Sequence, residues 1–345
     1  MATEVTCIVD TDGTQSPDYT SLAAAIAGET GASPKCVTSA NLVTNDEQLT
    51  IECRAKSGAA DTTAVTISGF TTDADNYVKI YVPSGHRHAG KWDANKYRIA
   101  ITTEDHTIAI TLSGYLVIDG LQIATTEYNS SSMYGIANNV AHHVTIKNCI
   151  IRSGNPAYAH LGIWFGAGSA NHSLLYNCIA YGFTNGIGYF LSGDNGTRYS
   201  TYCFNLIAYG CGNRGFGFDS ATFINCAAIN CTDGFNAWGS AHDYNVSDVS
   251  GDGSLGDHGF VTEQSPTEIF VDPDNGDFRL AANSDLIDAG TDLSASMDSV
   301  DIIGTSRPQG DYWDIGAFEF GSKWNGIIPA KWNGIDWSNL KWNGM

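Results

Sequence analysis

A repeated seven-residue pattern constrains the fold of this chain more than any other feature of its sequence. Five segments align without gaps: VIDGLQI from Val117, TIKNCII from Thr145, LLYNCIA from Leu174, YCFNLIA from Tyr202 and TFINCAA from Thr222. Their fourth residues are Gly120, Asn148, Asn177, Asn205 and Asn225, at spacings of 28, 29, 28 and 20 residues. Self-similarity at such a period is typical of solenoids, in which each repeat forms one coil stacked on the previous one.

A second series of short segments follows each copy of the first. Its glycines are Gly135, Gly162, Gly186, Gly215 and Gly234. Each repeat therefore holds two or three short strands separated by Gly or Asn turns, with no helical period between them. The pattern predicts an all-β chain folded as a right-handed parallel β-helix, with a single chain winding through strands about 4.8 Å apart.

Stacked coils place equivalent residues in columns, and two columns can be predicted from the alignment. The residue after each turn is small or medium-sized and apolar, as a core position requires: Leu121, Cys149, Cys178, Leu206 and Cys226. The turn residues Asn148, Asn177, Asn205 and Asn225 suit an asparagine ladder, because Asn tolerates a left-handed turn and its amide can bond from coil to coil.

Composition excludes several classes of partner. The formal net charge is 17 − 37 = −20, which repels phosphate backbones, so we expect no nucleic-acid partner. No run of eighteen apolar residues predicts a membrane span, and the start lacks the basic and apolar regions of a signal peptide. The nine cysteines form neither a CxxC pair nor a zinc pattern, so we expect buried thiols and no metal site.

Four regions are expected along the chain. Residues 1–35 form an N-terminal cap, whose helix lies in SPDYTSLAAAIAGETG and begins at Ser16 or Asp18. Residues 36–250 form the β-helix, with an insert at about 84–100 that projects sideways. Residues 251–320 form a C-terminal closing module, and residues 321–345 form a tail. Covers are needed because the first and last coils would otherwise expose core and strand edges.

The closing module carries a recognisable set of motifs. FVDPDNGDFRLAANSDLIDAGTDL and DIIGTSRPQGDYWDIGAFEF contain a GD(F/Y)xL turn, an LIDAG stretch, an RPQG turn and DIGAFE. This region, from Val271 to Phe320, resembles the module that closes many surface β-helix proteins of the pectate-lyase-like superfamily. The resemblance implies the fold and a surface-located, glycan-facing biology. It implies no activity, because that fold hosts lyases, hydrolases, esterases and inert spikes alike.

The enzymes of that superfamily have motifs that this sequence does not repeat. The paired aspartates and Gly-His-Gly of β-helix galacturonases are not found, nor is a clear match to the carboxylate cluster of pectate lyases. Asp10, Asp12 and the DPDNGD stretch offer oxygen ligands for Ca²⁺, but turns capped by their own Asp and Asn side chains explain them better. Ca²⁺ is the one cofactor that the sequence leaves open.

Counting four residues on from each glycine of the second series gives one candidate site. This column holds Gly166, Phe190, Asp219 and Trp238. Trp164, Arg214, His242 and Asp243 are expected nearby. Aromatic rings beside a carboxylate suit sugar rings, so we predict glycan binding by Trp238, Phe190, Trp164 and Asp219. Asp219, Asp243, His242 and Arg214 are weak catalytic candidates. The alternative is that Phe190 and Trp238 pack beneath a loop.

A third column bears on partners. Ile150, Ile179 and Ile207 point outward if the interior column is assigned correctly, and Tyr181 and Tyr209 accompany them. Strands that are apolar on both faces are normally covered on both. Either loops of the same chain cover this face or a second subunit does. We predict an oligomer face here and a homo-oligomer, with a trimer as the expected form.

The tail repeats Lys-Trp-Asn-Gly at Lys323, Lys331 and Lys341, and it carries Trp324, Trp332, Trp337 and Trp342. Repeated aromatic anchors suit several weak contacts acting together. The repeats resemble short Lys-x-Asn-Gly repeats at the ends of phage and prophage structural proteins. They predict contacts with other virion proteins, unless the tail folds back on its own β-helix.

Together these features predict a bacteriophage virion protein. It would be displayed on the capsid or tail, as a decoration or spike, and would be extracellular after lysis. One alternative is a polysaccharide lyase or glycoside hydrolase, and another is a secreted bacterial adhesin. We expect binding rather than catalysis, although the sequence leaves an enzymatic role open.

Overall fold

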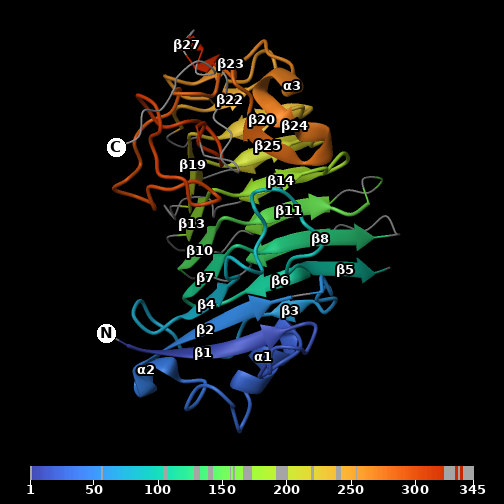
Figure 1. The fold of residues 1–345 in the computed structure, drawn as a ribbon, viewed down its shortest axis with the longest axis vertical. Helices are drawn as coiled ribbons and strands as arrows, with labels where there is room; N and C mark the ends of the chain where they lie inside the picture. The colour runs from blue at the N-terminus through green and yellow to red at the C-terminus, as the bar shows by residue number, and fades with distance from the viewer. Residues whose placement is uncertain are drawn as a thin grey trace.

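A computed structural model describes residues 2–55, 57–103, 108–127, 133–138, 143–155, 157, 160–165, 173–191, 201–218, 221–237, 242–253, 255–321, 331–332 and 335–336. Within these ranges, three parallel sheets run along the long axis of the molecule (Figure 1). Among the described helices, none is long and apolar enough to cross a membrane.

The first sheet begins at the N-terminus of the chain. Its strands are β1 (Thr3–Asp10), β2 (Glu47–Arg54), β4 (Val78–Tyr81), β7 (Leu116–Asp119), β10 (Val144–Lys147), β13 (Ser173–Tyr176), β16 (Thr201–Phe204) and β19 (Ala221–Ile224), paired in that order. The second sheet contains β5 (Ile99–Thr103), β8 (Gln122–Glu127), β11 (Ile150–Ser153), β14 (Ile179–Tyr181), β17 (Ile207–Tyr209), β20 (Ala227–Ile229), β22 (Val246–Ser247) and β23 (Phe260–Val261). The third contains β3 (Val65–Thr66), β6 (Ile108–Leu112), β9 (Met133–Asn138), β12 (His160–Phe165), β15 (Ile187–Leu191), β18 (Arg214–Phe218) and β21 (Asp233–Ala237).

Successive strands visit the three sheets in turn, which confirms the predicted parallel β-helix. The chain passes from β7 to β8 to β9, then starts the next coil with β10, and β10 pairs in parallel with β7. The predicted interior column is also confirmed, since Leu121, Cys149, Cys178, Leu206 and Cys226 are all 0% exposed. All nine cysteines are free thiols, and seven of them are buried.

The turn column behaves as its residue type predicts. Asn148, Asn177, Asn205 and Asn225 all have positive φ, between 52° and 56°. Asn177 donates its side-chain amide to Oδ1 of Asn148 on the neighbouring coil, at 3.3 Å. At Asn205 and Asn225 the amides instead bond backbone groups of the closing module. The asparagine ladder therefore has two roles. Asn148 and Asn177 bond one coil to the next, whereas Asn205 and Asn225 bind the closing module.

The N-terminal region differs from the predicted cap in two ways. Helix α1 (Leu22–Glu29) is present, but Ser21 is its N-cap rather than Ser16 or Asp18. Strand β1 pairs with β2 along its whole length, so the β-helix begins at Thr3 and not at residue 36. A short helix, α2 (Leu42–Asn45), precedes β2. Figure 1 shows both helices beyond β1, at the N-terminal end of the solenoid.

The insert at 84–100 was expected to project sideways, and this expectation is wrong. It lies against the outer face of the second sheet, where the backbone N–H of Asp93 donates to Gln122 on β8 at 2.7 Å. The guanidinium of Arg152 on β11 stacks 4.0 Å from the ring centroid of Trp92. The insert is held because it satisfies outward-facing polar groups of the sheet that would otherwise lack partners.

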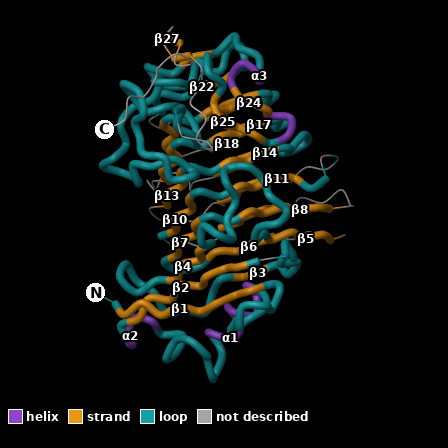
Figure 2. The backbone as a smooth tube through the Cα atoms, viewed as in Figure 1, coloured by secondary structure: helices purple, strands orange, loops and turns teal. Residues whose placement is uncertain are grey.

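The closing module lies over the last coils, and Figure 2 shows that loops make up most of it. Its regular elements are α3 (Pro266–Ile269), β24 (Phe270–Asp272), the 3₁₀ turn η1 (Pro273–Asn275) and β25 (Asp277–Leu280), with β24 antiparallel to β25. In the tail, β26 (Lys331–Trp332) pairs antiparallel with β27 (Ile335–Asp336).

The isoleucine strip is covered by this module, so the predicted oligomer face is wrong at these residues. Ile150, Ile179 and Ile207 are at most 1% exposed and form one apolar cluster with module side chains that include Phe270, Phe278, Leu286 and Ile315. Tyr209 belongs to the same cluster, and Tyr181 packs on it, edge-on to Phe278 with ring centroids 5.2 Å apart. The module supplies the apolar cover that the sequence pattern demanded. Self-association through another surface stays a prediction.

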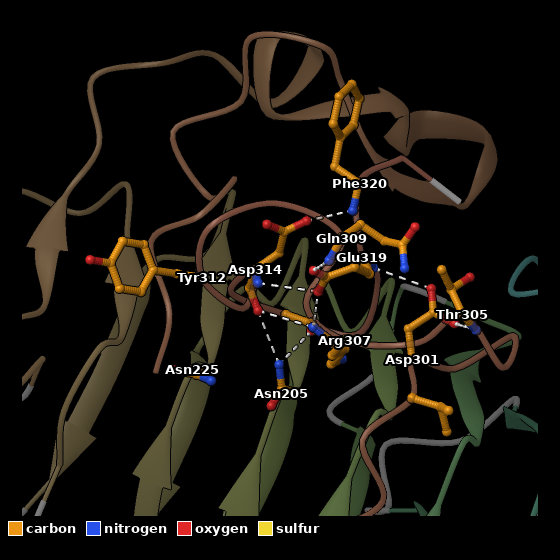
Figure 3. Close-up of polar contacts among 12 residues, drawn as sticks. Asn205, Asn225, Asp301, Thr305, Arg307, Gln309, Tyr312, Asp314, Glu319 and Phe320 are labelled. Atoms are coloured by element: carbon orange, nitrogen blue, oxygen red, sulfur yellow. Dashed lines mark hydrogen bonds and ion pairs between the residues drawn. The ribbon is translucent and has the colours of Figure 1, made fainter. Parts of the chain in front are cut away.

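A second contact fixes the module to the first sheet. Tyr176 and Phe204 pack there with Leu293, Met297 and Trp313. Between the two apolar contacts, Asn205 donates to the carbonyl groups of Asp314 and Gly316, both at 3.1 Å (Figure 3). The module thus straddles the asparagine edge of the β-helix, with one apolar patch on either side of it.

Candidate functional site

The outer face of the third sheet carries a row of aromatic side chains. Tyr134 on β9, Trp164 on β12 and Phe190 on β15 occupy three successive coils. Trp164 is paired directly with Phe190, and its ring centroid lies 5.1 Å from that of Tyr134. All three are partly exposed, whereas their neighbours Ile163 and Tyr189 are fully buried. We call Tyr134, Trp164 and Phe190 the aromatic ladder.

Alternation along each strand explains why Trp164 and Phe190 face outward. Residues that follow one another on a strand point to opposite faces, so the residue beside a core position is exposed. Ile163 and Phe165 are both buried, which turns Trp164 outward between them. Tyr189 and Leu191 do the same for Phe190. The stacking of coils then places Trp164 beside Phe190, and the ring centroid of Tyr134 lies 5.1 Å from that of Trp164.

Polar groups continue the ladder on the next two coils. Nε of Arg214 on β18 lies 3.6 Å from Oδ2 of Asp233 on β21, and each side chain is 34% exposed. Asn236 donates its amide to the same Asp233 oxygen at 2.9 Å. Arg214, Asp233 and Asn236 thus offer a guanidinium, a carboxylate and an amide to solvent. Each of these groups can form further hydrogen bonds.

Gly217 joins the aromatic and polar parts of this face. A Cβ atom there would lie 3.1 Å from Cδ2 of Phe190 and 3.3 Å from Cδ of Arg214. The side chains of Phe190 and Arg214 therefore both lie over Gly217, and the absence of a side chain there leaves space for them. The result is one continuous strip from Tyr134 to Asp233 along five coils of the solenoid.

The predicted column through Phe190 is wrong by two residues. Leu161 pairs with Ile187 and Ile163 with Tyr189, so the partner of Gly162 is Gly188 rather than Gly186. Phe190 accordingly shares its column with Trp164 and Gly217. Gly166, Asp219 and Trp238 lie outside the described residues, so glycan binding by Asp219 and Trp238 stays a prediction.

The remaining catalytic candidates have other partners. Asp243 bridges Ile224 beside the first sheet, and its carboxylate accepts from the His258 ring at 2.9 Å. Arg214 instead pairs with Asp233 on the third sheet. Arg214 and Asp243 therefore lie beside different sheets and have different partners, so the described residues do not bring these two candidates together.

The titration of His242 and Asp243 follows from their surroundings. Burial lowers the pKa of His242 to about 4, so the ring is neutral at pH 7 where it packs near Phe223. Burial acts to raise the pKa of Asp243, but hydrogen bonds from His258 and from backbone N–H groups outweigh it and hold that pKa below its ordinary value. Neither group is poised to exchange protons near neutral pH.

The carboxylates of the oxygen-rich turns have hydrogen-bond or ion-pair partners within the chain. Asp10 accepts from the N–H groups of Asp12, Thr14 and Gln15, and it is 0% exposed. Asp277 forms an ion pair with Arg279. Asp10 therefore has the capping role that the sequence left open as the alternative to Ca²⁺ ligation, and the carboxylate of Asp277 is paired with a guanidinium.

Sequence reasoning missed Tyr134 and Asn236. Both stand at fixed offsets from column glycines: Tyr134 directly precedes Gly135, and Asn236 lies two residues after Gly234, as Trp164 does after Gly162. A count of two from each glycine, with Gly188 in place of Gly186, would have found Trp164, Phe190 and Asn236, whereas on β9 it gives Ala137 rather than Tyr134.

Comparison with known proteins shows a likeness to a solved structure. No family model matches this sequence, and no curated protein matches it. Among solved structures, the crystal structure of pectate lyase Pel9A is similar over 92% of this chain and 97% of that chain, with 15% sequence identity and a TM-score of 0.42. The fold of the present chain is established by its own strand pairing.

Proposed function

We propose that this protein binds a polysaccharide along the outer face of its third sheet. The observation that carries the proposal is the aromatic ladder, in which Tyr134, Trp164 and Phe190 present partly exposed rings on successive coils. Aromatic faces pack against the apolar faces of sugar rings, and polar groups beside them bond the hydroxyls. Arg214, Asp233 and Asn236 supply those groups.

The regular spacing of these side chains along the stacked strands favours a ligand that itself repeats. Coils repeat at about 4.8 Å, and strands hold their side chains more rigidly than loops do. Several weak contacts along one chain then act together, which raises affinity without a deep pocket. A polymer of sugars meets this requirement better than a single sugar.

The charge of the protein further restricts the class of polysaccharide that we propose. The net charge of −20 disfavours a polyanion, and the one cation of the strip, Arg214, is already paired with Asp233. The proposed ligand is therefore a neutral polysaccharide rather than a polyuronate or a sulfated chain.

Affinity electrophoresis of the full chain through gels containing neutral and acidic polysaccharides tests this proposal. A neutral polysaccharide should retard the native protein, and Trp164→Ala with Phe190→Ala should abolish the retardation. Tyr312→Ala is the matched control, because Tyr312 is an aromatic residue on the closing module with 64% exposure. Equal retardation of the double variant and the native protein, or no retardation by any polysaccharide, would contradict the proposal.

The proposed setting is the surface of a bacteriophage particle, and it is supported by sequence alone. The Lys-Trp-Asn-Gly repeats follow the closing module, whose last buried residues are Phe318 and Glu319. The tail follows a completed cover, and we propose that it anchors the chain to another virion protein. Mass spectrometry of purified particles, with and without deletion of residues 321–345, tests this setting independently of glycan binding.

The enzyme alternative makes a different prediction on the same substrates. A lyase or hydrolase would shorten the bound polysaccharide, which a fall in viscosity or new chain ends would report. Binding without shortening supports the proposal, whereas shortening that depends on Arg214 and Asp233 would assign the alternative.

A further inference from the structure

A cluster of potential metal ligands lies at the N-terminal end of the β-helix, away from the aromatic ladder. Cys7 on β1, Asp18 in the turn before α1 and Cys36 in the loop after α1 come together. One ligand atom from each, two Sγ and one carboxylate oxygen, lie within 4.8 Å of one another. Among the described residues, this is the one such grouping of three His, Cys, Asp or Glu side chains.

We propose that Cys7, Asp18 and Cys36 bind a thiophilic divalent cation, with Zn²⁺ as the expected ion. Zinc takes thiolate sulfur at about 2.3 Å and carboxylate oxygen at about 2.0–2.2 Å in a tetrahedral arrangement. Its ligand atoms are then separated by about 3.3–3.8 Å, so the cluster needs at most a small contraction. Two thiolates favour zinc over Ca²⁺ or Mg²⁺, which prefer oxygen.

The surroundings fix the orientation of two of the three ligands. Asp18 accepts the backbone N–H of Ile8 through Oδ2 at 2.8 Å, which holds its carboxylate beside β1. The carboxylate of Glu29 accepts the backbone N–H groups of Lys35, Cys36 and Val37, at 2.9–3.2 Å. This brace sets the position of the Cys36 loop before any cation is bound. Outer contacts of this kind orient metal ligands in known sites.

The pattern of exposure suits entry of an ion. Cys7 is 0% exposed, whereas Asp18 and Cys36 are both partly exposed. A cation could therefore reach Cys36 and Asp18 from solvent and contact Cys7 from outside the core, and solvent would complete the coordination. In contrast, Cys149, Cys178 and Cys226 stack inside the solenoid, where they serve as apolar filler.

Charge balance also fits the proposal. Two thiolates and one carboxylate carry −3, so a bound divalent ion leaves −1. The ammonium of Lys35 bonds the backbone carbonyl of Asp18 and stacks 4.3 Å from the ring centroid of Tyr19, so a compensating cation is already present. A site of this kind would tie the loop after α1 to β1 and close the N-terminal end of the solenoid.

Binding must expel two protons. Burial raises the pKa of the Cys7 thiol well above its ordinary value and that of Cys36 to about 11, so both are neutral thiols at pH 7 in the free protein. Each sulfur loses its proton to solvent as it bonds the cation, with no change of oxidation state. Affinity should therefore rise with pH.

The experiment uses the full chain, reduced and stripped of metal, with Zn²⁺ added in competition with a chromophoric chelator. One equivalent should bind, and Co²⁺ in its place should give a thiolate-to-cobalt charge-transfer band. Cys36→Ser should reduce affinity by more than the roughly 10–100-fold that loss of an outer partner costs. Asp18→Asn keeps an acceptor for Ile8 and should weaken binding while preserving the fold.

Cys231→Ser is the matched control, because Cys231 is also partly exposed and adjoins a second thiol, Cys211, without belonging to the cluster. Retained binding in this variant, with loss in Cys36→Ser, supports the site. Three results would overturn it: no uptake of Zn²⁺ by the reduced protein, equal uptake by native protein and Cys36→Ser, or equal losses in Cys36→Ser and Cys231→Ser.

Discussion

Arg307 and Glu319 form an ion pair inside the closing module, with 2.9 Å between Nη1 and Oε2 and neither side chain exposed at all. Arg307 also donates to the carbonyl groups of Asp314 and Gly316 (Figure 3). Its other face approaches the asparagine ladder, 3.5 Å from Oδ1 of Asn177. The arginine of the RPQG turn and the glutamate of DIGAFE thus hold the module together at the point where it meets the β-helix.

Replacing Arg307 alone should be strongly destabilising. Arg307→Met leaves Glu319 buried without its cation, which costs about 3–5 kcal/mol of unfolding free energy when one member of a buried pair is removed. Arg54→Met is the control, since the Arg54–Glu52 pair is partly exposed and such pairs contribute about 0–1 kcal/mol. Chemical denaturation of both variants measures the difference, and equal losses would show that burial of the Arg307 pair is unimportant.

Much of the fold could be predicted because the repeat directly encodes position in the coil. The interior column from Leu121 to Cys226 and the turn column of asparagines both follow from one ungapped alignment. The third sheet was harder, because the NGIGY segment offers both Gly186 and Gly188 and the length of the coil before it varies. Only the pairing of β12 with β15 decides between them.

Contacts between the solenoid and segments outside the repeat could not be predicted. The sequence shows that Ile179 needs an apolar cover but not that Phe278 belongs to it, because a solenoid repeat says nothing about what packs outside it. The cluster of Cys7, Asp18 and Cys36 escaped for a related reason. Its members come from a strand, a turn and a loop, so their spacing follows no local ligand motif.

Truncating the isoleucine strip should loosen the closing module. Ile179→Ala removes buried methyl groups from the contact with Phe278 and should cost about 2–5 kcal/mol. Limited proteolysis should then cut within residues 251–320 sooner than in the native chain, while Val43→Ala, at a residue 38% exposed, should leave the rate unchanged. A fall in assembly mass without faster cleavage would instead indicate a subunit interface at this strip.

Asn205 should matter twice, once for its backbone and once for its amide. Its φ of 52° favours Asn or Gly, and its amide satisfies two buried carbonyl groups of the closing module. Asn205→Gly should lose about 1–3 kcal/mol through those carbonyls, and Asn205→Ala should lose about 1–2 kcal/mol more through its left-handed backbone. Asn230→Gly, at an exposed residue with a φ of 57°, should have a small effect. Thermal or chemical denaturation measures all three, and equal stability of the Gly and Ala variants at 205 would contradict the backbone argument.

The closing module should be less stable above neutral pH than below it. Three buried carboxyl groups, Asp301, Asp314 and Glu319, surround the single guanidinium of Arg307, and burial raises the pKa of all three. For Asp314, burial and then the charge of Glu319 raise the pKa to about 7, whereas the N–H groups of Asp288 and Phe320 and the charge of Arg307 act to lower it.

A raised folded-state pKa means that the folded protein holds the Asp314 proton more tightly than the unfolded chain does. The contribution of Asp314 is therefore fully present below the ordinary value of 3.8 and is lost as pH rises through about 7. Asp314→Asn removes this dependence and keeps an oxygen that can accept from Asp288 or Phe320. The unfolding free energy of the variant should rise relative to that of the native protein by on the order of 2–4 kcal/mol between pH 4 and pH 8. Denaturation curves measured at closely spaced pH values give this difference directly, and parallel curves for the two proteins would show that Asp314 is already ionised in the folded state.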